Sequence, residues 1–508
     1  MGRILLFLLK KFIKYKVLSV NGTQIQTKVY MKRISLFVAL AAVFFIGCRQ
    51  KPVQSPTPVF PVPSQQQLEW HQLETYAFIH FTTNTFTGKE WGYGDESPSV
   101  FRPTAIDVEQ WVRTLKETGF KAVILTAKHH DGFCLWPSAY TDHTVAASPY
   151  KNGKGDIVRE VSDACKKFDL KFGLYLSPWD RNRADYGTPS YITYYRNQLK
   201  ELFENYGPVF EMWLDGANGG DGYYGGARER RQIDGRHYYD WPGTVKMVRE
   251  MEPDVLFFSD AGPDIRWVGN ERGIAGETNW NPLTPDTLYA GKSGISDLLG
   301  RGHENGTHWI PAEVDVSIRP GWFYHAEEDA KVKTPEELFD IYLSSVGRGS
   351  NLLLNLPPDR RGLLHEKDVA HLQGFQRLVE ERLGHNFLEK GKVKTSASYD
   401  RTQRPAHLTD GDPDTFWAAK EVQATVEITL PEAAEIRYVT LAEHIAVGQR
   451  VKAFEVEVYD GKNWIPVAKG TTIGYKRILK MDPVTARKIR VRVTDARAPA
   501  VLAEVSAS

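Results

Sequence analysis

Up to about residue 390 the chain switches repeatedly between two patterns of apolar and polar positions. Segments 106–118, 156–168, 190–205, 241–252 and 335–346 place their apolar residues at helical spacing. Short apolar runs that suit buried strands separate them, at 76–81, 121–127, 171–177, 209–215, 254–260 and 351–357. Such alternation predicts parallel βαβ units, and over roughly 300 residues it favours a (β/α)8-like barrel in the α/β class.

Beyond residue 390 the helical spacing stops and short alternating runs appear at 424–430, 436–444, 453–461 and 488–495. This pattern is typical of an antiparallel β-sandwich. The chain is therefore expected to divide into an upstream extension (1–30), a signal peptide (31–48), a Pro-rich linker (49–66), a barrel domain (67–388) and a β-sandwich domain (391–508).

The N-terminal region has the pattern of an export signal. Met31 is a better start than Met1, and Lys32 and Arg33 precede the apolar run 34–47 and Cys48. A short basic head and about fourteen apolar residues describe a secretory signal. The cysteine after Gly47 resembles a bacterial lipobox, which predicts an exported periplasmic or outer-membrane lipoprotein. The alternative is plain cleavage with an incidental Cys48.

Charge and composition exclude several classes of protein. Eight of the 64 basic side chains and none of the 63 acidic ones lie in residues 1–47, so the remainder carries seven excess negative charges. That balance gives no electrostatic reason to bind nucleic acid. Three cysteines do not make a disulfide framework. The absence of GxGxxG after the first strand and of a Walker sequence disfavours dinucleotide and P-loop chemistry.

Polar side chains follow the predicted strands at the point where each ends. His80 ends the first strand, His129 and His130 follow the second, and Asp215 ends the fourth. The carboxyl ends of barrel strands meet in one mouth, so these residues are expected to converge there. Carboxylates, histidines and tryptophans in one mouth suit a sugar. A metal at the histidine pair is the alternative, but the sequence has neither HExxH nor CxxC.

Five motifs follow one another along the barrel region: IHFTTNTFTGKEWGYG (79–94), TAKHHDGFCLWPS (126–138), LYLSPWD (174–180), EMWLDGANG (211–219) and GRGSNLLLNLPPDRRG (347–362). In their order and spacing they resemble those of glycoside hydrolase family 29, the retaining α-L-fucosidases, and the similarity covers 67–385. A further stretch, DIRWVGNERG (264–273), resembles the subfamily that prefers α-1,3/4-linked fucose.

The resemblance implies a role for two carboxyl groups. Asp215 matches the nucleophile, and Glu271 matches the acid/base, which has to hold a proton near neutral pH. Trp267 offers Glu271 apolar surroundings, while Glu277 and Glu313 are fallback candidates for its role. The implied substrate-binding residues are His80, Glu90, Trp91, His129, His130, Tyr175, Trp213, Arg266 and Trp322, with Trp91 or Trp322 covering the C6 methyl group of fucose.

The C-terminal part resembles a discoidin or coagulation-factor type C module, which often binds carbohydrate. HLTDGDPDTFW (407–417) is similar to the calcium loop of that family. The resemblance implies a structural Ca²⁺ held by oxygen ligands from Asp410, Asp412, Thr415 and Glu504. An ordinary turn at 410–412 is the alternative.

The leading expectation is a retaining exo-α-L-fucosidase acting on Lewis-type branched oligosaccharides, with no cofactor for catalysis. Its expected partners are fucosylated oligosaccharides or glycoconjugates, with a membrane only through a lipid anchor. Three alternatives stay open: an α-L-fucosidase of broad specificity that also cleaves α-1,2 links, a catalytically inactive glycan-binding lipoprotein, and a metal-dependent barrel hydrolase.

Overall fold

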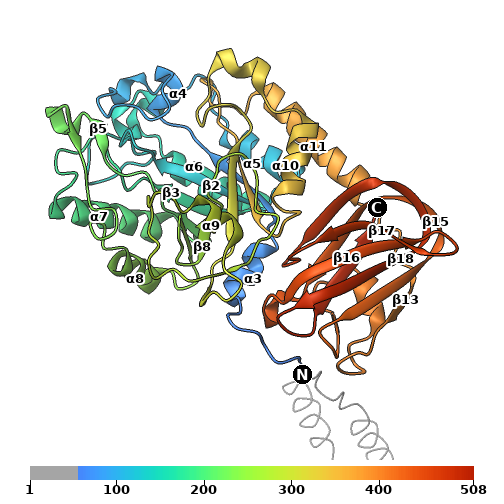
Figure 1. The fold of residues 1–508 in the computed structure, drawn as a ribbon. Helices are drawn as coiled ribbons and strands as arrows, with labels where there is room; N and C mark the ends of the chain where they lie inside the picture. Colours follow the sequence, from blue (N-terminus) through green and yellow to red (C-terminus); the bar gives the residue numbers. More distant parts are fainter. Residues whose placement is uncertain (1–54) are drawn as a thin grey trace, which may run out of the picture. The chain divides into compact units, whose positions relative to one another are not determined.

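The computed structural model describes residues 55–508, and its first domain is a closed parallel barrel of eight strands (Figure 1). The predicted barrel is confirmed, and six of its strands coincide with predicted apolar runs. The other two, β8 and β11, were not predicted. In barrel order the strands are β1 (Thr75–Ile79), β12 (Asn351–Asn355), β11 (Ala312–Ser317), β8 (Ile265–Trp267), β7 (Leu256–Ser259), β4 (Glu211–Trp213), β3 (Lys171–Leu176) and β2 (Ala122–Lys128).

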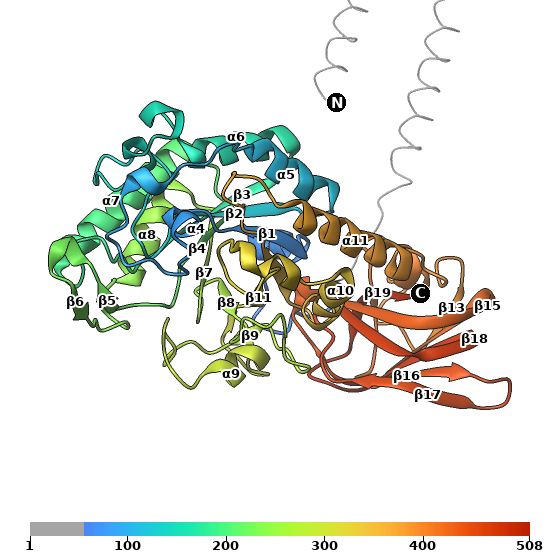
Figure 2. The same ribbon diagram turned by 90° about the horizontal axis from the view of Figure 1, so that it is seen from above.

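Helices surround the barrel strands, as the view from above shows (Figure 2). Asp107 and Asp156 begin α5 and α6 by accepting the N–H of Gln110 and Arg159, which satisfies a backbone donor that the helix leaves unpaired. The connection from β7 to β8 is the turn 260–264 instead of a helix. The helices are α3 (Gln65–His71), α4 (Thr83–Thr87), α5 (Val108–Glu117), α6 (Ile157–Phe168), α7 (Pro189–Tyr206), α8 (Trp241–Met251), α9 (Ser296–Arg301), α10 (Pro335–Ser344) and α11 (Glu366–Leu383).

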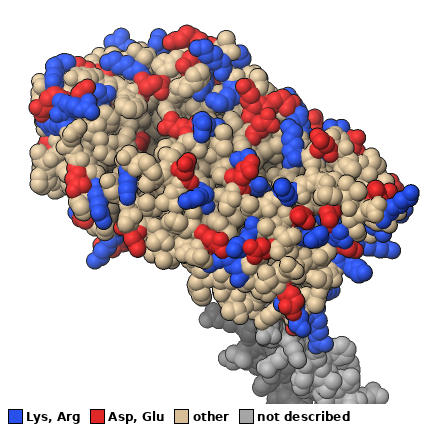
Figure 3. Space-filling model, in the orientation of Figure 1, with Lys and Arg blue, Asp and Glu red and all other residues tan. Residues whose placement is uncertain are grey.

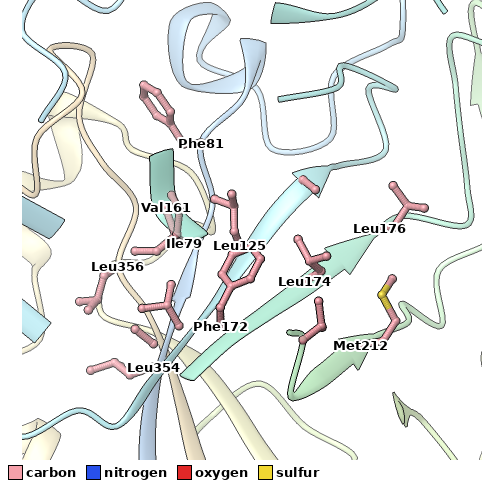
Figure 4. Close-up of a cluster of buried hydrophobic side chains, with 14 of the residues drawn as sticks. Ile79, Phe81, Leu125, Val161, Phe172, Leu174, Leu176, Met212, Leu354 and Leu356 are labelled. Atoms are coloured by element: carbon pink, nitrogen blue, oxygen red, sulfur yellow. The ribbon is translucent and has the colours of Figure 1, made fainter. Parts of the chain in front are cut away.

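Residues along each barrel strand alternate between two buried layers. Ile79, Leu125 and Met212 belong to the layer between strands and helices, part of which Figure 4 shows. Phe78 and Trp213, one position away, belong to a separate cluster inside the barrel. Because successive side chains of a strand point to opposite faces, the parity of a position decides whether it reaches the barrel interior.

The C-terminal domain is an antiparallel sheet, as predicted for its fold class. The predicted runs 424–430 and 436–444 belong to one strand, β15, which includes the polar segment between them. The pairing of β15 with β18 shifts register between Thr429 and Ala434 and again between Ile436 and Tyr438, and the strand continues through both shifts. The sheet consists of β13 (Lys392–Thr395), β14 (Trp417–Ala418), β15 (Ala424–Glu443), β16 (Val451–Tyr459), β17 (Trp464–Gly470), β18 (Arg477–Ala496) and β19 (Val501–Ala507).

Two small hairpins lie in loops of the barrel domain. The first pairs β5 (Gly220–Gly222) with β6 (Glu229–Arg231), and the second pairs β9 (Pro282–Leu283) with β10 (His308–Trp309). Both pairs are antiparallel and follow the carboxyl ends of barrel strands, β4 in the first case and β8 in the second. These insertions therefore lengthen the loops on the side of the barrel where the predicted site residues lie.

The C-terminal domain supplies hydrogen-bond partners to the backbone of the barrel loop 277–281. The Gln449 side chain accepts the N–H of Asn281 at 2.8 Å and donates to the carbonyl of Asn279 at 2.9 Å. The Thr472 hydroxyl accepts the N–H of Asn279 at 2.9 Å. Since these groups are buried, each bond satisfies a polar group that would otherwise be costly to bury.

The predicted signal peptide and Cys48 lie outside the described residues. The last part of the predicted linker is described: the N–H of Val59 donates to the carbonyl of Val447, and α3 already begins at Gln65. Within residues 55–508, none of the helices has the length and apolar character needed to span a bilayer. On the face shown in Figure 3, acidic and basic side chains are interspersed.

Candidate active site

A cavity of about 230 Å³ lies at the carboxyl ends of the barrel strands. Nine of the eleven predicted catalytic and substrate-binding residues line it, and Glu90 and Arg266 do not. The lining residues are Phe78, His80, Trp91, His129, His130, Tyr175, Trp213, Asp215, Gly216, Ala217, Asp260, Trp267, Glu271, Asp315 and Trp322. The structure therefore brings together the residues that the sequence analysis placed at strand ends, along with most of those that the family resemblance implied.

Asp215 lies two residues beyond the end of β4, with its carboxylate partly exposed to the cavity. Its Oδ2 accepts the Tyr175 hydroxyl at 2.8 Å, and its Oδ1 accepts the N–H of Ala217 at 2.7 Å. His130 Nε2 is 3.6 Å from Oδ2. Each carboxylate oxygen thus has a fixed neutral donor, an arrangement that orients the group without pairing it to a permanent cation.

The three histidines of the cavity are neutral at neutral pH. Burial lowers the pKa of His80 to about 3, and it lowers those of His129 and His130 below their usual value. His80 Nδ1 is 2.7 Å from Asn355 Oδ1, and His130 Nδ1 is 2.7 Å from the Ser177 hydroxyl. His129 Nδ1 has no protein partner within the described residues. A buried, unpaired ring nitrogen beside a cavity suits a ligand hydroxyl group.

Glu271 reaches the cavity from the loop that follows β8. Partial burial raises the pKa of its carboxyl, and the negative charges of Asp215 and Glu90 raise it further. A hydrogen bond from the Trp322 side chain lowers this pKa without cancelling the rise. Asn270 stabilises the turn by donating its side-chain N–H to the carbonyl of Ile274 at 2.8 Å. A carboxyl with a raised pKa beside a second carboxylate has the property of a general acid.

Aromatic rings form the rest of the wall. Trp213 is stacked on Phe258, with ring centres 4.1 Å apart. Trp322 lies with its ring centre 5.2 Å from that of His80. Trp91 stands at the mouth, 51% exposed and edge-on to His130. Apolar faces beside neutral imidazoles and carboxylates form a site for a ligand with one hydrophobic side and several hydroxyl groups.

Glu90 does not line the cavity but holds a segment that does. Its carboxylate accepts the backbone N–H of Trp322 at 2.7 Å and that of Phe323 at 3.3 Å, and it is 2.6 Å from His325 Nε2. All these partners belong to residues 322–325, so Glu90 fixes the backbone from which the Trp322 side chain extends. Direct contact of Glu90 with the substrate stays a prediction.

The expected place of Arg266 in the wall was wrong. Arg266 is the middle residue of β8 and points away from the barrel interior, since its neighbour Trp267 points inward. Its fully buried guanidinium donates to backbone carbonyls of Leu299, Trp280, Asn281 and Ile310 and to Asn279 Oδ1. It therefore ties β8 to the loops around it.

We expect Arg266→Met to lower the free energy of unfolding by at least about 3 kcal/mol, because several buried carbonyl groups lose their donors. Urea denaturation followed by tryptophan fluorescence measures this. Arg301→Met, at an exposed position of α9, serves as control and should change stability by less than about 0.5 kcal/mol. A stably folded Arg266→Met protein whose only defect is a higher KM would instead indicate that Arg266 contacts the substrate.

Six lining residues were not on the predicted list of site residues: Phe78, Gly216, Ala217, Asp260, Trp267 and Asp315. Trp267 was expected only as apolar surroundings of Glu271. Asp260 follows β7, accepts the N–H of Gly291 at 2.7 Å, and has its pKa raised to about 6, chiefly by burial. The signal that could have found Asp260 is its position at the end of the predicted strand 254–260, the same signal that found Asp215 at the end of 209–215.

The two fallback candidates for the acid lie away from the cavity wall. Glu277 is 79% exposed and 3.6 Å from Arg348. Glu313 is buried in the barrel interior, where its carboxylate accepts the Trp213 indole N–H at 2.7 Å and the Tyr76 hydroxyl. Burial raises its pKa to about 7, and burial together with the charge of Glu313 raises the pKa of the neighbouring Glu211. Glu271 is thus the only one of the three that lines the cavity.

The residues of the expected calcium loop lie near one another. Both Asp410 oxygens accept the Thr415 hydroxyl at 3.0 Å, and Glu504 accepts the N–H of Gly411 at 3.3 Å. Over residues 55–508, no group of three or more His, Cys, Asp or Glu side chains is placed to hold a metal ion. Ca²⁺ also takes backbone carbonyl oxygens as ligands, so calcium at this loop stays a prediction.

Comparisons with known proteins agree with this geometry. The family model for alpha-L-fucosidase matches residues 58–381, and that for the F5/8 type C domain matches residues 392–505. Alpha-L-fucosidase 1 of Arabidopsis thaliana is 40% identical over 87% of this chain and 86% of its own. A glycoside hydrolase 29 family member from an unknown rumen bacterium is 42% identical, with a TM-score of 0.80 over 89% of this chain and 78% of that one.

A second solved structure was determined with a sugar. The Ruminococcus gnavus GH29 fucosidase in complex with fucose is 33% identical and superposes with a TM-score of 0.80, over 91% of this chain and 97% of that one. Both structural matches include the barrel and extend beyond it, since they cover far more of the chain than the barrel domain alone.

Proposed function

The chain belongs to the alpha-L-fucosidase family of glycoside hydrolases, and on this premise we propose that it hydrolyses terminal α-L-fucose from glycans by a retaining double displacement. The observation that carries the proposal is Asp215, a carboxylate held by Tyr175 and the Ala217 N–H in the same cavity as Glu271. Two carboxyl groups flanking one sugar site are what retaining hydrolysis needs.

The proposed reaction has two displacements at the anomeric carbon. In the first, the Asp215 carboxylate forms an ester with that carbon, the bond to the glycosidic oxygen breaks, and Glu271 gives its proton to the leaving oxygen. In the second, the Glu271 carboxylate takes a proton from water, the water oxygen attacks the same carbon, and Asp215 leaves as a carboxylate. Two inversions release α-L-fucose, and no cofactor enters the balance.

The cavity also supports recognition of fucose. Neutral His80, His129 and His130 are able to donate or accept hydrogen bonds, so they suit sugar hydroxyl groups. Trp213 and Trp322 present apolar surface to the ring and its methyl group. The relative described above as a complex with fucose has the same fold and is 33% identical, which favours the same ligand here.

The anomer formed first tests the mechanism. Proton NMR during rapid hydrolysis of an aryl α-L-fucoside should show α-L-fucose before mutarotation produces the β anomer. Initial β-L-fucose would replace the retaining mechanism with an inverting one. Release of no fucose from aryl fucosides or glycans by the folded protein would favour the glycan-binding alternative.

We further propose a preference for fucose linked α-1,3 or α-1,4 in Lewis-type branches. The support is the resemblance of the stretch 264–273 to the subfamily with that preference, and this stretch contributes Trp267 and Glu271 to the cavity wall. Fucose released from Lewis trisaccharides and from 2'-fucosyllactose is the measurement. Efficient release from 2'-fucosyllactose would leave only the broad-specificity reading, and poor activity on Lewis sugars would remove the preference.

For the region before residue 55 we propose export with a lipid on Cys48, on the basis of the basic head, apolar run and cysteine of residues 31–48. In cells fed an alkyne fatty acid, Cys48→Ser should abolish labelling and release the protein from membranes. Cys165→Ser, at a buried cysteine of α6, should keep the label. Unlabelled parent protein in the soluble fraction would favour plain cleavage.

A further inference from the structure

Asp315 is a buried carboxyl group in the cavity to which the proposed reaction gives no role. It lies on β11, is 3% exposed, and lines the cavity beside Glu271 and Trp267. By strand alternation Glu313 and Asp315 both point into the barrel, with Asp315 nearer to the carboxyl end of the strand and Glu313 deeper. Carboxyl groups therefore continue from the cavity wall into the barrel interior.

The contacts of Asp315 connect it to the loop of the acid/base. Its Oδ1 accepts the indole N–H of Trp267 at 2.7 Å. Trp267 is the last residue of β8, and the next N–H, that of Val268, donates to the carbonyl of Glu313 on the same strand as Asp315. These two bonds fix both the side chain and the backbone at the start of the segment that ends in Glu271.

The electrostatic surroundings of Asp315 favour its neutral form over its ionised form. Burial raises its pKa well above the usual value, and the charges of Glu271 and Glu313 raise it further. As a neutral group it lies beside Glu271 without repelling the carboxylate that forms when Glu271 gives up its proton. A protonated carboxyl is also a hydrogen-bond donor, which an ionised aspartate is not.

We propose that Asp315 is a positioning residue for the acid/base, fixing Trp267 and stabilising Glu271 from the floor of the cavity. This inference rests on the proposed role of Glu271. The other charged groups that act on Glu271 are Asp215, from the end of β4, and Glu90, from the loop after α4. Asp315 differs from both because it bonds directly to the strand that leads to Glu271.

Dependence on the leaving group separates positioning of an acid from a structural role. An aryl α-L-fucoside with a dinitrophenolate leaving group needs no proton in the first displacement, whereas a phenyl fucoside does. We expect Asp315→Ala to lower kcat/KM for the phenyl fucoside about 10²-fold, within the range that a general acid contributes, and for the dinitrophenyl fucoside less than about threefold. Asp315→Asn, which keeps a neutral acceptor, should restore part of the loss.

Two further variants make the result decisive. Asp260→Ala removes another buried cavity carboxyl without touching Trp267 and should affect both substrates alike. Equal losses on both substrates for Asp315→Ala and Asp315→Asn would overturn the proposal and leave Asp315 structural. If Glu271→Gln also lowers both equally, the proposed role of Glu271 has failed instead. Thermal melting checks folding, and Asp315→Asn keeps the test valid if the alanine variant does not fold.

Discussion

Replacing Asp215 by glycine lowers kcat on aryl fucosides at least about 10⁴-fold, as expected when the nucleophile of a covalent mechanism is lost. No other carboxylate takes its place, because Asp260, the cavity carboxyl whose charge interacts with it, accepts the N–H of Gly291 and lies against Gly216. Release of the aryl group, followed by absorbance, measures the effect. Tyr175 and Ala217 keep their places and lose only the oxygens to which they donate.

A small anion tests whether the lost group was the nucleophile. Azide should enter the space left by the Asp215 carboxylate and give β-L-fucosyl azide, the product of a single inversion. The control is Asp221→Gly, at a carboxylate of β5 that is 62% exposed and outside the cavity, and it should keep the parent rate. Activity of Asp215→Gly within tenfold of the parent would show that another residue forms the covalent bond.

Replacing Glu271 by glutamine lowers kcat/KM about 10²- to 10⁴-fold on substrates with poor leaving groups and little on dinitrophenyl fucoside. The amide keeps the size of the side chain but has no proton to transfer. Glu277→Gln is the matched control, since Glu277 is exposed, lies outside the cavity, and belongs to a loop that Arg477 and Thr471 contact. An equal loss in both glutamine variants would contradict the assignment of the acid.

The pH dependence gives the assignment of Glu271 a second test. The first displacement needs Glu271 protonated, so kcat/KM falls as the pH rises through the pKa of that carboxyl. Burial and the charges of Asp215 and Glu90 raise this pKa, which moves the basic limb to higher pH than an ordinary glutamate gives. With phenyl fucoside, whose leaving group needs the proton, the parent should show this basic limb and Glu271→Gln should lose it. A basic limb that stays in place would belong to another group.

The architecture could be predicted wherever burial left an unbroken apolar run. Strands such as β2 and β3 are buried almost throughout, so they appear in the sequence as continuous apolar stretches. β8 and β11 were not predicted, because the ionisable residues Arg266, Glu313 and Asp315 interrupt their apolar pattern. In both strands the charged groups are buried and hydrogen-bonded, a condition that no local pattern reveals.

The same two strands explain the errors about the site. Asp215 and the histidines were found because each follows a recognisable strand and falls within a family motif. Arg266 was placed in the wall because, without knowledge of β8, its parity relative to Trp267 was unknown. Asp315 was missed because β11 was not predicted either, so the direction of its side chains was unknown. Glu90 was found by its motif, but its protein partners, residues 322–325, lie more than two hundred residues away in sequence and could not be predicted.

The hydrogen bonds of Gln449 between the two domains limit which C-terminal domains can be exchanged between relatives. Its amide and the Thr472 hydroxyl complete the backbone bonding of Asn279 and Asn281, and Arg266 holds the same loop from the barrel side. A chimaera that takes its C-terminal domain from a relative must therefore import an equivalent amide at this point. A shortened protein that ends after α11 would leave backbone groups of the loop 277–281 without these partners. The same loop is hydrogen-bonded to Arg266 on β8, next to Trp267. The sequence pattern thus changes at the boundary between the two domains, but hydrogen bonds connect the domains across it.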